Sequence, residues 1–150
     1  SSVKDLWWDV RPHPGFGTVE IRVCDIPITF KEIIAIVALI QGLVVTLINS
    51  EPYPDTHIQI LQSNKWQAAR YGLDGIHVDP KNFQKLSIKK AIENLFLLVQ
   101  PTMSSLGTEK YLGQLEEVLN GSTGSTIQRN LYKKSKDFKK VIKTLMEKFY

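Results

Sequence analysis

Cysteine and histidine are scarce in this sequence, and their scarcity limits the chemistry that it can support. The only cysteine is Cys24, so no disulfide can form within the chain, and we expect a reducing, cytoplasmic location. The histidines are His13, His57 and His77, whose separations do not match metal-ligand spacing. No histidine is placed to activate Cys24, which is therefore interpreted as a small filler and not as a nucleophile.

No basic stretch followed by an apolar segment opens the sequence, so we expect no signal peptide, and the one apolar run is expected to be too short to cross a membrane. The chain begins at Ser1 without an initiator methionine, so we expect a fragment or a processed product. Residues 33–48 are mostly apolar, but these 16 residues fall short of the ~20 that cross a bilayer, and Gln41, Gly42 and Thr46 interrupt them. We therefore predict a helix buried on most sides in a soluble core, and no membrane partner.

The charge balance is only mildly basic, with a formal net charge of +4. Seven lysines lie between residues 133 and 148. No base-stacking aromatic residues or nucleic-acid motif accompany them, so we expect a solvated face and no nucleic-acid partner. The length and the 43% hydrophobic content suit one soluble globular domain or a large part of one.

Two strands are predicted at the start of the chain. Residues 4–11 suit a strand, residues 12–15 with two prolines indicate a loop, and residues 17–24 alternate strictly between apolar and polar. The short connection predicts an antiparallel pair. The apolar face of the second strand, formed by Val19, Ile21 and Val23, is expected to pack against the long apolar helix.

Helices are predicted from about residue 29 onwards. Thr29 and Glu32 have capping-box spacing at the start of a helix that ends near residue 48. The fold class is therefore α+β, an antiparallel strand pair followed by a mainly helical region. The further expected elements are a short helix in 54–64, irregular structure in 65–86, a helix that ends before Pro101, a helix closed by Gly121, a short helix after Gly124, and an amphipathic helix in 138–149.

The polar face of the strand pair carries the candidate chemistry. If the register agrees, one surface presents Asp9, Arg11, Glu20 and Arg22. This surface is either the solvated face of a sheet, with ion pairs worth a few tenths of a kcal/mol, or the wall of a pocket for metal and phosphate. Glutamate is a hard oxygen ligand that suits Mg²⁺, and arginine offers a planar fork for phosphate or carboxylate oxygens.

Three segments resemble one family. They are WWDVRPHPGFGTVEIRVCD at residues 7–25, NKWQAARYGLDG at residues 64–75 and GSTGSTIQRN at residues 121–130, called here the first, second and third signature segments. Together they resemble the type 2 glutamate–cysteine ligases, also called carboxylate–amine ligases. The resemblance implies that residues 1–150 are the C-terminal half of a single catalytic domain, whose strands belong to a curved sheet like that of glutamine synthetase.

The resemblance also implies an activity and roles for residues. ATP would phosphorylate the γ-carboxylate of glutamate, and an amine such as that of cysteine would displace phosphate, as in glutathione biosynthesis. Glu20 would bind Mg²⁺ and Arg22 would act in catalysis on the phosphoryl group. Asp9, Arg11 and Arg70 would bind substrate or ATP, although a salt bridge is an equally good interpretation of Arg70. The family also implies a homodimer.

Several residues keep open interpretations. Asn64 suits a helix C-cap or a site. Gly124 and Ser125 open a helix that either binds an anion or is simply capped there. Gln128 and Arg129 match the family pattern without an assigned role.

The sequence shows no second acidic cluster on a strand after Asp25, and Glu109, Glu116 and Glu117 fall on predicted helices and look solvated. We therefore expect the isolated chain to be an incomplete enzyme. The alternative is a non-catalytic helical module that binds a partner through its basic final helix.

Overall fold

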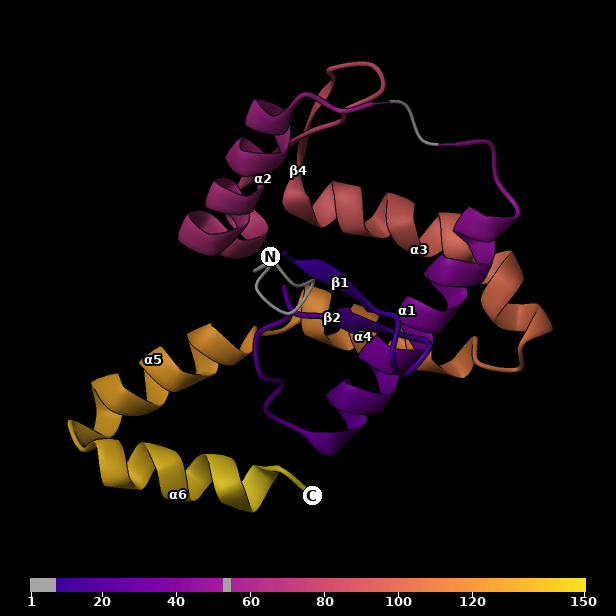
Figure 1. The fold of residues 1–150 in the computed structure, drawn as a ribbon. Coiled ribbons are helices and arrows are strands. Elements are labelled where there is room, and N and C mark those ends of the chain that lie inside the picture. The colour runs from indigo at the N-terminus through magenta and orange to yellow at the C-terminus, as the bar shows by residue number, and fades with distance from the viewer. Residues whose placement is uncertain (1–7, 53–54) are drawn as a thin grey trace.

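The computed structural model describes residues 8–52 and 55–150 of the chain, and it confirms the α+β class. Within these residues there are two antiparallel strand pairs and six α-helices. Figure 1 shows three groups: a central set of helices, a helix with a small hairpin above it, and a helical hairpin that extends away at the carboxyl end. The signature segments lie where these groups meet.

The core lies between α1 (Phe30–Ile48), α3 (Ile88–Ser105) and α4 (Lys110–Asn120), as seen in Figure 1. α1 packs against both of the other helices. Val99 and Met103 of α3 are fully buried, and the rest of the cluster is contributed by apolar side chains of all three helices. The buried members of this cluster are Ala38, Phe96, Val99, Met103, Leu112 and Leu119.

A glycine lets α1 and α3 approach closely. A Cβ atom built on Gly42 would lie 2.5 Å from Cγ of Met103, so only glycine leaves room for this side chain. Beside it, the Thr46 hydroxyl donates to the Thr102 hydroxyl at 2.8 Å. These contacts also explain why α3 continues through Pro101 to Ser105, where the sequence predicted that it would end.

The start of α1 is capped as predicted. The Thr29 hydroxyl accepts from the Glu32 amide at 3.1 Å, and the Glu32 carboxylate reaches back to the Ile28 amide at 2.9 Å. The prediction that α1 is buried on most sides is wrong, because among its described residues only Ala35, Ala38 and Gly42 are buried.

The outer face of α1 remains apolar. By length and composition α1 is long enough to span a membrane, with a mean hydropathy of 2.1. Only 17% of that span is buried in the structure.

Strands β1 (Val10–His13) and β2 (Thr18–Ile21) pair antiparallel, as expected. The predicted strand at 4–11 lies partly outside the described residues, and the predicted loop at 12–15 is wrong for Pro12 and His13. The Arg22 amide donates to the Asp9 carbonyl, so these two residues form a hydrogen-bonded pair. Hydrogen-bonded and non-hydrogen-bonded pairs alternate along an antiparallel ladder, so Pro12 and Val19 form a non-hydrogen-bonded pair. Proline is tolerated at such a position because no donor is needed there.

The apolar face of β2 does not pack as predicted. Val19 is 60% exposed and Val23, beyond the end of the strand, is 56% exposed. The reason is that the inner face of α1 is already covered by α3 and α4.

The region 65–86, predicted to be irregular, is ordered. α2 (Ile58–Tyr71) continues past residue 64 into a 3₁₀ turn, η2 (Gly72–Asp74), and then into the hairpin of β3 (Ile76–Val78) and β4 (Lys85–Ser87). Asn64 is therefore not a C-cap. Its side-chain amide donates to the Val78 carbonyl and accepts from the Val78 amide, both at 2.8 Å, which fixes the hairpin to α2.

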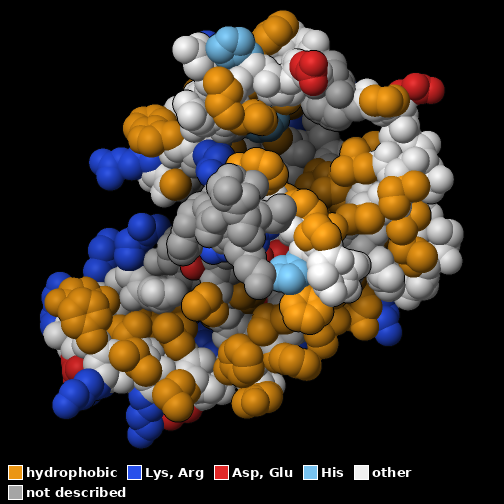
Figure 2. Space-filling view, viewed as in Figure 1, with side chains coloured by type: hydrophobic (Ala, Val, Ile, Leu, Met, Phe, Trp, Pro, Cys, Tyr) orange, Lys and Arg blue, Asp and Glu red, His pale blue; other side chains and the backbone are white. Residues whose placement is uncertain are grey.

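The carboxyl end forms a helical hairpin of α5 (Gly124–Ser135) and α6 (Phe138–Lys148), seen at the lower left of Figure 1. Tyr132 and Phe138 stack with their rings 4.4 Å apart, and the Phe30 amide donates to the Phe149 carbonyl at 2.8 Å. The predicted apolar stripe of α6 is only partly used, because Val141 is buried but Ile142 is exposed. Figure 2 shows Lys and Arg side chains gathered around this hairpin.

Candidate active site

A charge cluster on the β1–β2 pair brings together three of the predicted site residues. The register places Arg11 opposite Glu20, and Arg11 Nε donates to Glu20 Oε2 at 2.8 Å. Arg22 Nη1 lies 3.8 Å from the same oxygen. Both contacts use the same carboxylate oxygen, Oε2. The cluster therefore places two cations beside one half-exposed carboxylate.

Asp9, predicted on the same surface, binds a different partner. Its carboxylate pairs with Lys65 Nζ of α2 at 2.8 Å. The pair is exposed on both sides, so its contribution to stability is small, about 0–1 kcal/mol. Its importance is positional, because it joins the first signature segment to the second.

Arg70 lies in a cavity that the second and third signature segments build together. The cavity has a volume of about 320 Å³ and lies between the end of α2, the η2 turn and the first two turns of α5. Its charged lining residues are Arg70, Asp74 and Arg129. Arg70 has no carboxylate partner among the described residues, which argues against the salt-bridge interpretation.

The beginning of α5 is the point where the segments meet. Thr123 caps the helix, and its hydroxyl accepts from the Thr126 amide at 3.4 Å. A second cavity of about 340 Å³ is lined by Cys24 and Asp25 of the first segment and by Gly124 and Ser125 of the third. The third segment therefore lines a cavity with each of the others, so the three segments lie in one region of the molecule.

Comparison with known proteins gives this region a family. The family model described as glutamate–cysteine ligase family 2 matches residues 1–147. The chain belongs to glutamate–cysteine ligase family 2. A protein of Gloeobacter violaceus named "Putative glutamate--cysteine ligase 2" is 36% identical over 148 residues, which is 96% of this chain and 40% of that protein.

Relatives with the same name occur in other bacteria. The protein of Solibacter usitatus is 33% identical over 150 residues, and that of Sorangium cellulosum is 31% identical over 150 residues. These alignments cover 97% of this chain, and 39% and 40% of the two relatives. The chain thus spans about 40% of the length of the glutamate–cysteine ligase family 2 proteins it matches.

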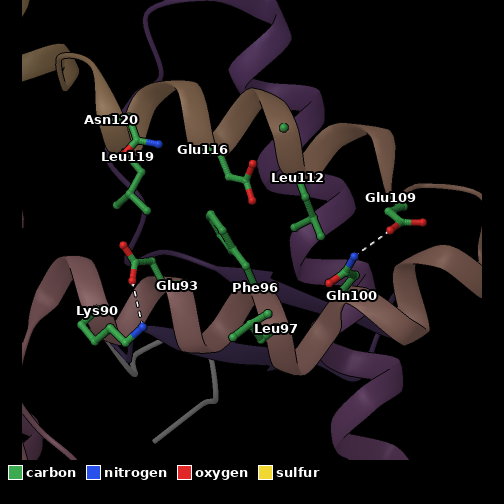
Figure 3. A pocket seen from close by; sticks show the side chains of 11 residues that line it. Lys90, Glu93, Phe96, Leu97, Gln100, Glu109, Leu112, Glu116, Leu119 and Asn120 are labelled. Atoms are coloured by element: carbon green, nitrogen blue, oxygen red, sulfur yellow. Dashed lines mark hydrogen bonds and ion pairs between the residues drawn. The ribbon is translucent and has the colours of Figure 1, made fainter.

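A polar cleft of the helical core lies outside the signature segments of this family member. The cleft has a volume of about 470 Å³, and Figure 3 shows its lining side chains between α3 and α4. Gln100 Nε2 donates to Glu109 Oε1 at 2.9 Å, and Lys90 pairs with Glu93 at 3.1 Å. The hydrogen bond from Gln100, and one from Ser104, lower the pKa of the Glu109 carboxyl below its ordinary value. Glu116 is exposed, as the sequence predicted.

Metal-ligand residues do not cluster in the described part of this family member. Within residues 8–52 and 55–150, no group of three or more His, Cys, Asp or Glu side chains could hold a metal ion. His57 instead caps α2, where its Nδ1 accepts from the Gln59 amide at 3.4 Å. Cys24 is exposed, so it fills no core space, contrary to its predicted role.

Sequence reasoning gave no role to Arg129 and treated Asn64 as a C-cap or a site residue. The structure places Arg129 in the cavity with Arg70 and makes Asn64 the link between α2 and β3. Only the helical spacing of Ser125 and Arg129, four residues apart, could have indicated that these two side chains meet.

Proposed function

We propose that this chain is the C-terminal part of the catalytic domain of an ATP-dependent carboxylate–amine ligase. The reaction joins the γ-carboxylate of glutamate to an amine such as that of cysteine. Membership of glutamate–cysteine ligase family 2 supports the reaction class. The single structural observation that carries the proposal is the meeting of the three signature segments at the start of α5.

The proposed chemistry needs cations placed around the phosphoryl group more than it needs a nucleophilic side chain of the protein, because both nucleophiles are supplied by the substrates. The γ-phosphoryl group of ATP passes to the glutamate carboxylate, and the amine then attacks the acyl phosphate and displaces phosphate. Such transfers depend on positioning and on neutralising charge. In this proposal Arg22 stabilises the transferring phosphoryl group, while Asp9, Arg11 and Arg70 bind substrate or nucleotide.

The cluster of Glu20, Arg11 and Arg22 suits Mg²⁺ only when the ion is already bound to phosphate. Glu20 offers a half-exposed carboxylate, but Arg11 and Arg22 beside it would repel a bare cation. Mg²⁺ in nucleotide sites keeps several waters and binds through one or two carboxylates plus phosphate oxygens. Glu20 would hold it, and the ion would neutralise charge on the phosphates.

The wider setting is part of the same proposal. We expect a cytoplasmic protein that acts on small molecules, without a nucleic-acid or membrane partner, and that forms a homodimer. One exposed cysteine and no disulfide suit a reducing compartment.

A second candidate function rests on α6. Lys139, Lys140 and Lys143 are exposed on this helix beside the exposed Ile142 and Met146. A basic face next to apolar side chains could dock a partner protein without any catalysis. Under this alternative, replacing the three lysines with glutamate abolishes partner binding, whereas the ligase proposal predicts an unchanged ligase rate.

The test is a transplant into a longer relative. The 150-residue chain alone should release no phosphate above background from glutamate, cysteine and Mg·ATP. Placed in the Gloeobacter violaceus protein in place of its matching segment, it should support phosphate release that depends on glutamate and on the amine. The parent protein is the positive control, and mass spectrometry identifies the γ-glutamyl product. A folded chimera that is inactive beside an active parent would refute the proposal, and robust turnover by the isolated chain would show that it is not incomplete.

A further inference from the structure

Two arginines from different signature segments line the same cavity. Arg70 lies in the last turn of α2 and Arg129 in the second turn of α5, and both border the space of about 320 Å³. This volume is at the small end of the range of ligand pockets, ~300–1,000 Å³, so the space suits a small group and not a whole nucleotide. Asp74 is the one acidic residue among the lining residues, which leaves the cavity with a net positive charge.

Arg129 is held in place by its own helix. Its Nη2 donates to Ser125 Oγ at 3.1 Å, and the Ser125 hydroxyl lies 3.2 Å from that of Thr123. This leaves the other donors of the guanidinium for a ligand, because neither arginine has a carboxylate partner among the described residues. Two guanidiniums and one carboxylate among the lining residues give the cavity an excess positive charge, which a bound anion would offset.

The helix adds donors of the same kind. The amide of Ser125, a lining residue of the cavity, belongs to the first turn of α5, where no carbonyl of the helix can accept from it. The helix dipole gives the same end a partial positive charge. Planar guanidinium forks and backbone amides together match the oxygens of a phosphoryl group better than those of any neutral ligand.

We infer that this cavity binds a phosphoryl group, with Arg70 and Arg129 as its two cationic ligands and Ser125 as a positioning residue for Arg129. The phosphoryl group could belong to a nucleotide or be free phosphate, since both present the same oxygens. That the bound phosphate is on the path of the ligase reaction rests on the proposed function. The binding itself does not.

The test measures binding to the full-length protein by calorimetry, with Mg·ATP and with inorganic phosphate as separate probes. Arg129→Gln should weaken binding of the probe that the cavity takes by about 10- to 100-fold, the range for a charge-assisted hydrogen bond to an ion. Lys133→Gln removes the same charge one turn further along α5, outside the cavity, and should change the affinity less than about twofold. Circular dichroism checks that both variants are folded.

Ser125→Ala separates positioning from general charge. It keeps both arginines but removes the hydroxyl that Arg129 contacts, so it should weaken binding by a smaller factor than Arg129→Gln. Arg129→Lys keeps the charge without the fork and should restore only part of the affinity. A loss for Mg·ATP alone assigns the cavity to the nucleotide, and a loss for both probes assigns it to any phosphate.

The outcomes separate this inference from the proposed function. If a γ-glutamyl product forms and Arg129→Gln leaves the binding of both Mg·ATP and inorganic phosphate unchanged, the inference is wrong and the function stands. If the wild-type protein binds phosphate through Arg129 but forms no product, the inference stands and the function is wrong. Equal effects of Arg129→Gln and Lys133→Gln, or no binding of either probe by the wild-type protein, overturn the inference.

Discussion

Glu20→Gln should change ATP binding in opposite directions with and without Mg²⁺. The side chain of Glu20 lies 2.8 Å from Arg11 and 3.8 Å from Arg22, and the substitution removes one negative charge beside these two arginines. One added charge about 6 Å from a phosphate gains about 0.7 kcal/mol at the dielectric constant of water, which is about threefold in affinity. ATP without metal should therefore bind about three times more tightly.

With Mg²⁺ the same variant should bind more weakly. Loss of even a supporting residue of a metal site costs about 10- to 100-fold, so loss of a direct ligand should cost Mg·ATP at least about tenfold. Because Glu20 is half exposed, its ion pairs contribute only about 0–1 kcal/mol and the variant should stay folded.

The assay is calorimetric titration of the full-length protein with ATP, in EDTA and in excess Mg²⁺. Glu117→Gln makes the same change of charge at an exposed position of α4 and serves as the matched control. If Glu20→Gln shifts both affinities in the same direction, Glu20 does not hold the metal, and the cluster is only a set of ion pairs on a sheet.

Three further predictions concern the scaffold. Gly42→Ala should destabilise the wild-type protein by about 1–3 kcal/mol in urea unfolding, because the new methyl group would collide with Met103. In a Met103→Ala variant the methyl group has space and alanine is the better helix former, so Gly42→Ala should stabilise that variant by up to about 1 kcal/mol. Additive effects of the two substitutions would contradict the close approach of α1 and α3. Asn64→Ala should lower the free energy of unfolding by about 1–3 kcal/mol and speed amide exchange in β3. Asn64→Asp keeps one of the two hydrogen bonds to Val78 and should cost less. Identical losses of stability in the two variants would contradict the link between Asn64 and β3. Gln100→Ala should raise the pKa of Glu109 towards its ordinary value, because a hydrogen bond to the carboxylate is lost, and an NMR titration that finds no change would disprove that cause.

The helices of the core could be predicted because their signals are local. Thr29 and Glu32 marked the start of α1, and Gly121 marked the end of α4, where its amide donates to the Glu117 carbonyl. The hairpin of β3 and β4 could not be predicted, because strands of three residues are too short to show alternation and are held by the Asn64 side chain 14 positions away.

Two errors share one physical cause, which is that tertiary contacts override local rules. Proline normally ends a helix, but Pro101 lies inside α3 because Thr102 and Met103 pack against α1. Proline also normally ends a strand, but Pro12 occupies a position where β2 requires no donor. Neither position can be recognised without the register or the packing partner.

For the candidate site, the sequence predicted which side chains of one strand share a face, but not which side chains of different segments lie together. Alternation correctly placed Glu20 and Arg22 on one face, and the register confirmed Arg11 beside them. The meeting of Arg70 and Arg129 joins residues 59 positions apart on two helices, and no periodic pattern connects them. The roles of these residues in binding and catalysis stay predictions.

The central claim is that the three signature segments form one nucleotide-binding region. Hydrogen exchange of the full-length protein, measured by mass spectrometry with and without Mg·ATP, tests it most directly. Peptides that cover residues 18–25, 68–75 and 121–129 should all exchange more slowly with the nucleotide, while peptides of the α3–α4 cleft should not change. Protection confined to that cleft, or absent from the first turn of α5, would contradict the claim.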